Sequence, residues 1–545
     1  MISNKDLAKQ FKLLGDLMEL HKENPFKIRS YNNAYITLRK LPEPVAELSE
    51  EERSEIKGIG KAINSKITEL ATTGKMSTLE RYLQDTPKGI VELLQIKGLG
   101  PKKIRVIWKD LGVEDIGELL YAINENRLIE LSGFGAKTQE DLRQKLDYFQ
   151  QNIGNVHFAL LHEFGSQLQE SLLQNRKEED KIERFGVFAN QDTVGEKVQL
   201  AMNFQLPKGI IQQLKLNIVE DAEERVVVQS EAGLVAELVS VSPDSFGSFL
   251  LSHSALPASI LIDINAKFND EKSFFESKQL AFVPAPIRHL DHVWDFAKSG
   301  KVYPMIQVED IQGVIHNHST YSDGMNSMEE MIQAAQSKGY TYMLMTDHSK
   351  SAFYANGLKE DRLVEQWAEI DALNAKFSDF QMLKGIECDI LNDGSLDYEE
   401  EILKQFDAVI ISVHSNLRMD EEKATNRILK AIENPYSSIL GHPTGRLLLS
   451  RKGYPLDHKK IIDACAANGV HIELNANPWR LDLDPEWIPY AMEKGIKISI
   501  NPDAHSVKGI DDIKYGVLAA QGGGLTKEAC LNAVSVEDFM ALLKK

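Results

Sequence analysis

The sequence predicts a multidomain chain with small all-helical domains at its N-terminus and a barrel of alternating strands and helices at its C-terminus. The barrel is predicted because short apolar runs alternate with segments of helical periodicity over about the last 240 residues. The helical domains are predicted because the first 150 residues repeat an apolar-x-Gly-apolar-Gly pattern before helical segments. A chain of 545 residues with 43% hydrophobic side chains is long enough for several packed cores.

Charge is shared unevenly along the chain. The formal net charge is −19, whereas the first 110 residues hold 20 Lys and Arg against 15 Asp and Glu. This basic N-terminal part is where we expect DNA to bind. The three cysteines, Cys388, Cys465 and Cys530, suggest no disulfide framework, and the sequence has neither a long apolar run nor a leader at Met1. We therefore expect a cytoplasmic protein without a membrane span.

Three short repeats in the N-terminal part read IKGIGK from residue 56, IKGLGPKK from residue 96 and LSGFGAK from residue 131. Their glycines allow tight turns that expose backbone N–H groups, and the following helix start and the lysines add positive charge. Such turns bind DNA phosphates without reading bases, although a glycine can also simply end a helix. The repeats resemble the helix-hairpin-helix motif, and the predicted DNA contacts are Gly58, Gly60, Lys61, Gly98, Gly100, Lys102, Lys103, Gly133 and Gly135.

The stretch from Asn24 to Tyr82 is similar to the small lyase domain of family X DNA polymerases. The resemblance implies that Lys66 could form a Schiff base with a 5′-deoxyribose phosphate, and that Lys27 and Tyr31 lie beside the phosphate. A lysine amine needs partial desolvation or nearby cations to be nucleophilic near neutral pH, and Lys61 could supply part of that charge. The alternative is a solvated lysine on a helix.

The middle of the chain resembles the palm of the same family, which is an α+β domain, but it lacks the chemistry of that palm. The resemblance is anchored by Gly186, Gly195 and the run from Pro243 to Gly247. Two-metal nucleotidyl transfer needs carboxylates that hold both Mg²⁺ ions. The departing residues are Val187 in the serine place, Ala189 and Asn190 in the arginine places, and Glu196, Val198 and Glu237 in the aspartate places. We therefore predict a degenerate palm without polymerase activity.

Proline and glycine break the periodicity between Pro284 and Ile306, where we place the last domain boundary. Beyond it, seven apolar runs predict parallel strands, and a metal-type side chain or an asparagine follows each run. In a βα barrel the loops after all strands meet on one rim. Nine side chains would gather there, namely His316, His318, Asp323, His348, Glu387, His414, His442, Asp503 and His505.

This set of side chains predicts a multinuclear metal site. A single histidine after a strand is usually a satisfied core or surface residue. Nine metal-type side chains in register instead favour a shared metal site. Imidazoles and carboxylates without cysteine suit Zn²⁺, Mn²⁺ or Fe²⁺. Counting bridging carboxylates and waters, nine ligands can hold about three ions, and a mixed set is an option.

The motifs H-x-H, S-D-G, T-D-H-S, G-H-P and D-A-H, in this order from His316, resemble the PHP (polymerase and histidinol phosphatase) family. The resemblance runs from about residue 306 to the end, and all nine ligand positions match. It implies a distorted seven-stranded βα barrel with a trinuclear metal cluster that hydrolyses phosphoesters. Pro502 departs from the usual threonine, and we expect a small local effect. Arg446 and Arg480 are candidates for binding a phosphate oxygen, with surface arginines as the alternative.

The full expectation is a chain similar to bacterial family X DNA polymerases with a C-terminal PHP domain. The predicted parts are a lyase-like domain (1–82), a second helix-hairpin-helix domain (83–150), a degenerate palm (151–245), a thumb-like segment with a linker (246–305) and the barrel (306–545). The expected function is a DNA-repair phosphodiesterase that uses Mn²⁺ or Zn²⁺ for 3′-5′ exonuclease and 3′-end processing of gapped, nicked or 3′-blocked DNA. The alternatives are a small-molecule phosphomonoesterase of the histidinol-phosphate type and a non-catalytic DNA-binding scaffold.

Overall fold

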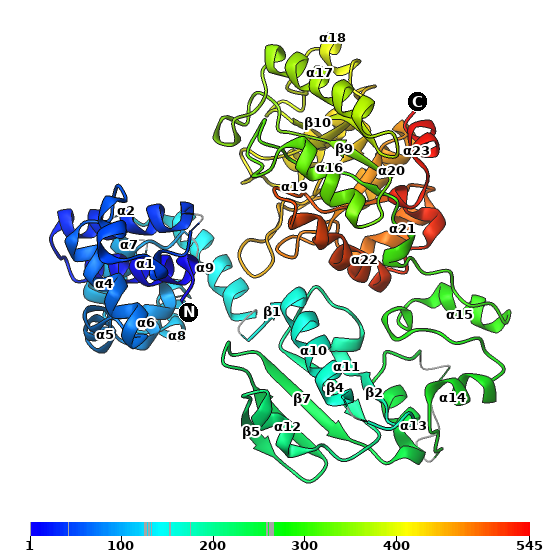
Figure 1. Cartoon of the computed structure of the whole chain (residues 1–545), viewed down its shortest axis with the longest axis horizontal. Helices are drawn as coiled ribbons and strands as arrows, with labels where there is room; N and C mark the ends of the chain where they lie inside the picture. The colour runs from blue at the N-terminus through cyan, green and yellow to red at the C-terminus, as the bar shows by residue number, and fades with distance from the viewer. Residues whose placement is uncertain are drawn as a thin grey trace. The chain divides into compact units, whose positions relative to one another are not determined.

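The protein forms two compact units, Met1–Ile153 and Gly154–Lys545 (Figure 1). The computed structural model describes all residues except 1, 42, 97, 125–127, 129–130, 132, 152–153, 175, 258–259, 261–265 and 545. Lys97 and Ser132 of the predicted hairpins therefore lie outside the described residues. No described helix combines the length and the apolar character that crossing a bilayer requires.

The first unit is helical throughout its described residues, as predicted. One apolar core runs through it, from Leu7 in the first helix to Leu146 in the last. In each hairpin the two glycines are exposed, while the apolar residue between them, Ile59, Leu99 or Phe134, is buried in this core. The helices are α1 (Asn4–Leu20), α2 (Pro25–Lys40), α3 (Glu50–Glu55), α4 (Lys61–Thr73), α5 (Ser77–Gln84), α6 (Lys88–Leu93), α7 (Pro101–Leu111), α8 (Ile116–Asn124) and α9 (Ala136–Gln151).

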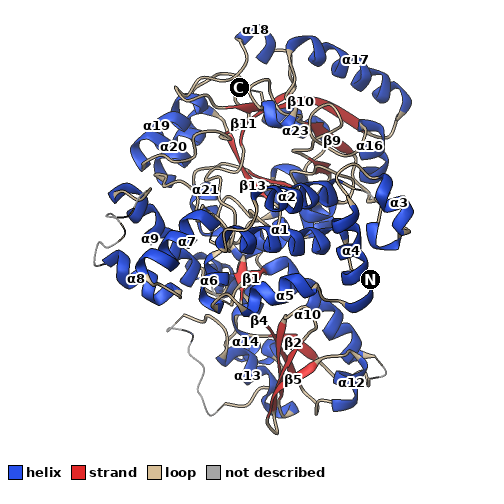
Figure 2. Cartoon of the chain, turned by 90° about the vertical axis from the view of Figure 1, so that its left-hand side faces the viewer, coloured by secondary structure: helices blue, strands red, loops and turns tan. Residues whose placement is uncertain are grey.

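The second unit begins with a mixed α/β region, in which Figure 2 shows the strands in red. Its five-stranded sheet has the order β2-β4-β7-β6-β5, in which only β4 and β7 pair in parallel. Helix α10 (Phe158–Leu173) packs on this sheet through Leu161 and Leu168. The strands are β2 (Ile182–Arg184), β4 (Lys197–Met202), β5 (Asn217–Asp221), β6 (Arg225–Gln229) and β7 (Val235–Ser240), and β1 (Val156–His157) pairs separately with β3 (Val194–Gly195).

The short helices α11 (Gly186–Ala189), α12 (Lys208–Gln213) and α13 (Phe246–Ser252) belong to this region, and α14 (Glu271–Ser277) and α15 (Asp291–Lys298) follow it. A small apolar core of its own holds α14 and α15 together, with Phe275 stacked 6.1 Å from Trp294. The two compact units are coarser than the five predicted domains, so those domain bounds stay a prediction.

The barrel at the C-terminus has seven parallel strands in chain order, which confirms the predicted architecture. Because both faces of a parallel sheet are covered, its strands read as continuous apolar runs, and every residue of β9, β11, β13 and β14 is buried. The strands are β8 (Gly313–Val314), β9 (Tyr342–Met345), β10 (Gln381–Asp389), β11 (Ala408–Ser412), β12 (Ile439–Leu440), β13 (His471–Asn475) and β14 (Ile498–Asn501).

The barrel closes just beyond the ends of its first and last strands. Asn317 forms a parallel bridge with Ala504, and the backbone N–H of His318 donates to the Ala504 carbonyl over 2.9 Å. The surrounding helices are α16 (Met328–Ser337), α17 (Glu360–Lys376), α18 (Glu400–Leu403), α19 (Glu421–Ile432), α20 (His458–Asn468), α21 (Ile488–Glu493), α22 (Ile513–Gly522) and α23 (Val536–Leu542). This closure brings the loops after β8 and β14 together.

Alternation along the strands divides the barrel residues between two cores. Leu344, Leu383 and Ile410 belong to an inner cluster with Phe539 of α23, whose ring lies 5.4 Å from that of Tyr342. Their strand neighbours belong to the larger cluster that also contains the helices. Cys388 is in this larger cluster, on the opposite side of its strand from Glu387, as strand alternation predicts. The inside of the barrel is therefore apolar at one end and leads to the ligand residues at the other end.

Candidate metal centre

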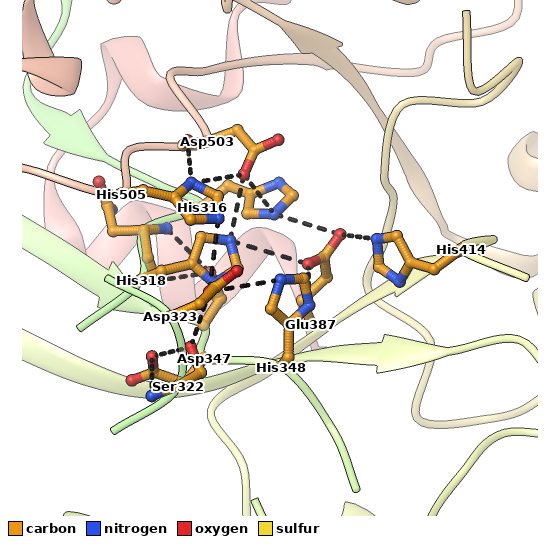
Figure 3. A network of polar contacts seen from close by, with 12 residues as sticks. His316, His318, Ser322, Asp323, Asp347, His348, Glu387, His414, Asp503 and His505 are labelled. Carbon is orange, nitrogen blue, oxygen red and sulfur yellow. Dashed lines mark hydrogen bonds and ion pairs between the residues drawn. The ribbon is translucent and has the colours of Figure 1, made fainter. Parts of the chain in front are cut away.

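The predicted ligands gather at the carboxyl ends of the barrel strands (Figure 3). Eight of them fall into three overlapping groups whose ligand atoms lie within 4.8 Å of one another. His442 joins through its Nε2, which is 2.9 Å from Glu387 Oε1. The groups share His318 and His348, so they form one continuous cluster; they are His318, Asp323, His348 and His505, then His316, His318 and Asp503, then His348, Glu387 and His414.

Strand alternation explains why these side chains point inward. In β10 the inner face carries Leu383, Gly385 and then Glu387. In β11 it carries Ile410 and Ser412, and His414 follows two residues beyond the strand end. The last residue of each series is the ligand. The apolar residues below it fill the barrel, and the chain can therefore bury the charged residue without losing its core.

Three of the predicted ligands have an unusual backbone. His316, His442 and Asp503 have φ of 64°, 22° and 51°. These values lie in the left-handed region, which costs of order 1–3 kcal/mol for a residue other than glycine and is concentrated at functional sites. The surrounding structure therefore holds these three side chains in place at some expense in stability.

The carboxylate of Glu387 lies at the middle of the cluster, between imidazoles on both sides (Figure 3). Its Oε1 is 3.0 Å from His414 Nε2 and 3.3 Å from His316 Nε2, and its Oε2 is 2.9 Å from His348 Nδ1. Two ligands that each lie about 2.0–2.2 Å from one ion are separated by comparable distances. Glu387 is therefore placed to bridge ions, as expected for a carboxylate in a multinuclear site.

The electrostatics of the cluster also fit cations. Burial alone would raise the pKa of Glu387, but His414, His316 and His348 hold it well below its ordinary value. Burial alone would lower the pKa of His316, but Glu473, Glu387 and Asp503 outweigh it and raise that pKa. Within the described part of the chain, the buried His316 Nε2, His318 Nδ1 and Glu387 Oε2 lie close to oppositely charged ligand groups, but none of these contacts has the geometry of a hydrogen bond. Buried polar atoms of this kind call for a ligand, and the residues present fit a cluster of divalent ions.

Three buried carboxylates that the sequence analysis did not assign hold the ligands in place. Glu473 accepts a hydrogen bond from His316 Nδ1 over 2.6 Å, and Asp389 accepts one from His414 Nδ1. Fixing Nδ1 as the donor leaves Nε2 of each ring available for an ion. Asp347 accepts hydrogen bonds from Ser319 and Ser322 in the loop that leads to Asp323. Strand alternation could have identified Glu473, because its neighbours Ile472 and Leu474 in β13 belong to the outer core and Glu473 therefore faces inward.

The two candidate arginines differ in their contacts. Arg446 donates to the carbonyl oxygens of Arg480 and Leu481 and pairs with Asp484, so its guanidinium holds the loop that carries Arg480. Arg480 Nε lies 3.6 Å from Asp503 Oδ2, at the cluster. Of the two, Arg480 is therefore the one placed to reach a phosphate bound there, while Arg446 positions the loop.

The hairpins of the first unit leave backbone N–H groups accessible. Gly60 and Gly100 are the N-caps of α4 and α7, and neither helix start receives a side-chain hydrogen bond at its cap. Among the neighbouring lysines, Lys61 and Lys102 are exposed, while Lys103 lies over the Phe134 ring of the third hairpin. The third hairpin has the same form, with an open space around Gly133 and Gly135.

The residues predicted around the lyase position differ in accessibility. Lys66 is half-buried and donates to Thr78 Oγ1 over 2.7 Å. Burial lowers the pKa of Lys66, with Arg81 adding to the effect and Glu69 opposing it. Lys27 is exposed, whereas Tyr31 is buried and stacks on Phe11 at 6.1 Å. Tyr31 therefore belongs mainly to the core of the unit.

In the α/β region an ion-pair cluster occupies the place where the family resemblance puts the last aspartate. Glu237 lies 2.8 Å from Lys197 Nζ and 2.5 Å from Arg225 Nε. Burial alone would raise the pKa of Glu237, but hydrogen bonds from Lys197, Arg225 and Gln199 hold that pKa at about 2. Val198 is fully buried, and Glu196 is exposed. Within the described residues, all groups of side chains able to hold a metal lie in the barrel.

Comparison with known proteins gives three domain matches. Residues 2–76 match a helix-hairpin-helix domain, residues 90–147 match a SAM-like helix-hairpin-helix tandem, and residues 315–477 match a PHP domain. Asp503 and His505 lie beyond the PHP match, yet the barrel brings both to the cluster.

Relatives match either the whole chain or the barrel alone. The DNA polymerase/3′-5′ exonuclease PolX of Bacillus subtilis (strain 168) is 33% identical over 575 residues, covering 99% of both chains. Probable phosphatases of Thermoanaerobacter sp. (strain X514) and Caldanaerobacter subterraneus subsp. tengcongensis are 30% and 25% identical over 231 and 228 residues. These two alignments cover 40% of this chain and 88% and 85% of the relatives.

Proposed function

Since the chain belongs to the family X DNA polymerases that carry a C-terminal PHP domain, we propose that its barrel hydrolyses DNA from 3′ ends as a 3′-5′ exonuclease and 3′-end-processing enzyme of DNA repair. The observation that carries this proposal is the cluster around Glu387, in which all nine predicted ligands come together in a chain that also has three helix-hairpin-helix turns. The proposed substrates are gapped, nicked or 3′-blocked DNA, and the proposed ions are about three of Mn²⁺ or Zn²⁺, with Fe²⁺ as an alternative.

The side chains divide the work of such a reaction. Divalent ions at this site would acidify water and neutralise phosphate charge. Glu387 and Asp503 supply the buried negative charge that holds cations, and Glu473 keeps His316 in the tautomer that offers Nε2. Arg480 is the proposed contact for a non-bridging phosphate oxygen, because a guanidinium pairs with phosphate through two N–H groups.

We propose further that the palm does not synthesise DNA. The support is the contact of Glu237 with Lys197 and Arg225, together with valine at position 198. A carboxylate neutralised by two cations is a poor ligand for Mg²⁺, and valine cannot coordinate an ion. The Bacillus subtilis relative is named a DNA polymerase, and we expect this chain to differ from it at this centre.

One assay tests hydrolysis and synthesis together. Purified protein is incubated with 5′-labelled gapped DNA and Mn²⁺, with and without nucleotides. We expect the labelled strand to shorten from its 3′ end in both reactions and never to lengthen. Extension would overturn the proposal for the palm. Hydrolysis of small phosphomonoesters but not of DNA would favour the phosphomonoesterase alternative, and inertness of the metal-loaded protein would favour a scaffold.

The hairpins are expected to bind DNA through their backbone. Replacing Gly58 and Gly98 by valine should weaken binding roughly 10-fold for every DNA sequence, since phosphate contacts carry no base information. The two glycines have φ of 102° and 88°, and a Cβ at either would lie 2.8 Å from a neighbouring side chain. Fluorescence anisotropy on two unrelated sequences measures the effect. Gly74→Val is the control, because Gly74 also has a positive φ but ends α4 outside the hairpins.

We propose that Lys66 is a lyase nucleophile, supported by its lowered pKa and partial burial. Borohydride should trap the protein on DNA with a 5′-deoxyribose phosphate, because it reduces a Schiff base to a stable bond. The Lys66→Ala variant should lose this product, whereas Lys75→Ala, which removes an exposed lysine beyond the same helix, should retain it. Equal trapping of the two variants would assign the bond to another amine.

A further inference from the structure

Exposed apolar side chains of the barrel lie mainly on the rim that carries the metal centre. Among the described residues from 306 to 544, four large hydrophobic side chains are exposed, namely Met325 (79%), Phe353 (83%), Val364 (62%) and Trp479 (53%). Val364 is on α17, on the outside of the barrel. The other three lie in loops that follow β8, β9 and β13. Because parallel strands end at one face, these three side chains share the rim with the ligands.

Each of the three lies next to the metal centre in sequence. Met325 is two residues after Asp323, and Phe353 is five residues after His348. Trp479 precedes Arg480, the arginine whose Nε lies 3.6 Å from Asp503. Single exposed hydrophobic residues are common on protein surfaces, but three from separate loops around one charged centre are unlike a random scatter. We call these three residues the apolar rim.

The loops of the apolar rim are held by hydrogen bonds. The Met325 N–H donates to the His505 carbonyl over 2.7 Å, and the Leu448 N–H donates to the Trp479 carbonyl over 2.7 Å. Phe353 begins a short 3₁₀ turn, and its N–H donates to the Ser351 carbonyl over 2.9 Å. These side chains are therefore presented to solvent by ordered backbone, which lowers the entropy cost of binding a ligand.

Trp479 is also supported from behind by the α/β region. The imidazole of His157 lies 4.2 Å from the Trp479 ring, and His157 Nε2 is 3.2 Å from the carbonyl oxygen of Leu448. One side of the indole thus rests on the protein while about half of its surface stays open. An aromatic ring held in this way is suited to stacking against a flat partner.

We propose that the apolar rim contacts the bases of the DNA strand whose phosphate lies at the metal centre, with Trp479 as the stacking residue. This inference rests on the proposed function. Each nucleotide offers a charged phosphate and a flat apolar base, and the barrel offers a cation site and an apolar rim side by side. Stacking on an aromatic side chain tolerates every base because each base has a π-face. The rim would thereby favour nucleotides over small phosphoesters without a base.

The test compares DNA with and without bases at the 3′ end. The full-length protein with Mn²⁺ is given a single strand that ends in five thymidines, or the same strand with abasic residues in those places. We expect Trp479→Ala to lower kcat/KM on the thymidine strand by on the order of 10-fold more than on the abasic strand. Phe353→Ala and Met325→Ala should have smaller effects of the same kind, and Trp479→Phe should recover most of the loss.

Val364→Ala is the matched control, since it removes an exposed apolar side chain from α17 and should behave as the wild type does on both strands. If Trp479→Ala lowers kcat/KM equally on the two strands, or on neither, the proposed contact between the apolar rim and the bases is wrong. Failure of the wild type to cut either strand would contradict the proposed function instead. In that case fluorescence anisotropy measures the affinity for the same two strands, and the hairpins do not affect the comparison because they do not read bases. If Trp479→Ala loses affinity for the thymidine strand only, the proposed base contact is supported. If it does not, the proposed base contact is wrong.

Discussion

Replacing His316 and His318 together by alanine is expected to abolish DNA hydrolysis, with kcat/KM falling by about 10³-fold or more. The two imidazoles contribute to two of the three overlapping ligand groups, and both are fully buried. Their loss would remove ligands from neighbouring ion positions at once and leave Glu387 and Asp503 with fewer imidazole partners. Such a site should lose bound metal as well as activity.

Three measurements check this expectation. End-labelled DNA gives the rate, mass spectrometry of the dialysed protein gives the metal content, and circular dichroism shows whether the variant is folded. His458→Ala is the control. His458, in helix α20, is a barrel histidine outside the nine ligands, and its ring stacks on Trp487. A folded double variant that still hydrolyses DNA at the rate of the control would show that these two histidines are dispensable.

The barrel was predictable because its strands are buried on both faces. Runs such as YMLM at 342–345 and AVIIS at 408–412 are almost entirely apolar and fully buried, and each ends near a metal-type side chain. Strand lengths were less predictable. β8 and β12 have only two residues each, since the chain turns into the ligand loops almost at once. The parallel order and the shared rim needed only the alternation of strands and helices.

The roles of Arg446, Arg480 and Tyr31 could not be assigned from sequence because they depend on the direction in which each side chain points. Arg446 and Arg480 have the same chemistry, and only the fold shows that Arg446 binds the carbonyls of the loop while Arg480 lies near Asp503. Tyr31 similarly matched a phosphate neighbour, but helix α2 turns it onto Phe11. In both cases a motif identifies the position of a residue but not its contacts.

In the palm-like region the sequence indicates that metal-binding carboxylates are missing, and the fold shows which contacts the residue in one of their places makes. Valine at 198 and glutamate at 237 depart from the carboxylate pattern. The structure adds that Glu237 binds Lys197 of the neighbouring strand β4 and Arg225 of β6. Cross-strand ion pairs of this kind stabilise a sheet, so Glu237 contributes to the stability of this region.

The second large effect is expected at Glu473, which touches no substrate. Its carboxylate is fully buried and accepts hydrogen bonds from His316 Nδ1, the His442 N–H, and the side-chain amides of Asn475 and Asn501. Glu473→Leu would remove the shared acceptor of these four buried donors, and we expect it to destabilise the protein by about 3–5 kcal/mol. Thermal unfolding followed by circular dichroism measures this loss, and Glu537→Gln on the exposed face of α23 should leave the transition unchanged.

The conservative Glu473→Gln variant separates the effect of Glu473 on the His316 ring from its effect on the stability of the fold. Glutamine keeps the size of the side chain, but its amide can present an N–H to His316 Nδ1 and so move the ring proton to Nε2, where an ion would bind. Partners of metal-binding histidines typically contribute 10–100-fold to metal affinity. We therefore expect a folded protein with metal affinity lower by about 10–100-fold, and with DNA hydrolysis restored by excess Mn²⁺. If Glu473→Gln binds Mn²⁺ as tightly as the wild type in calorimetry, the carboxylate serves only the fold, and His316 obtains its orientation from its own strained backbone, with φ of 64°.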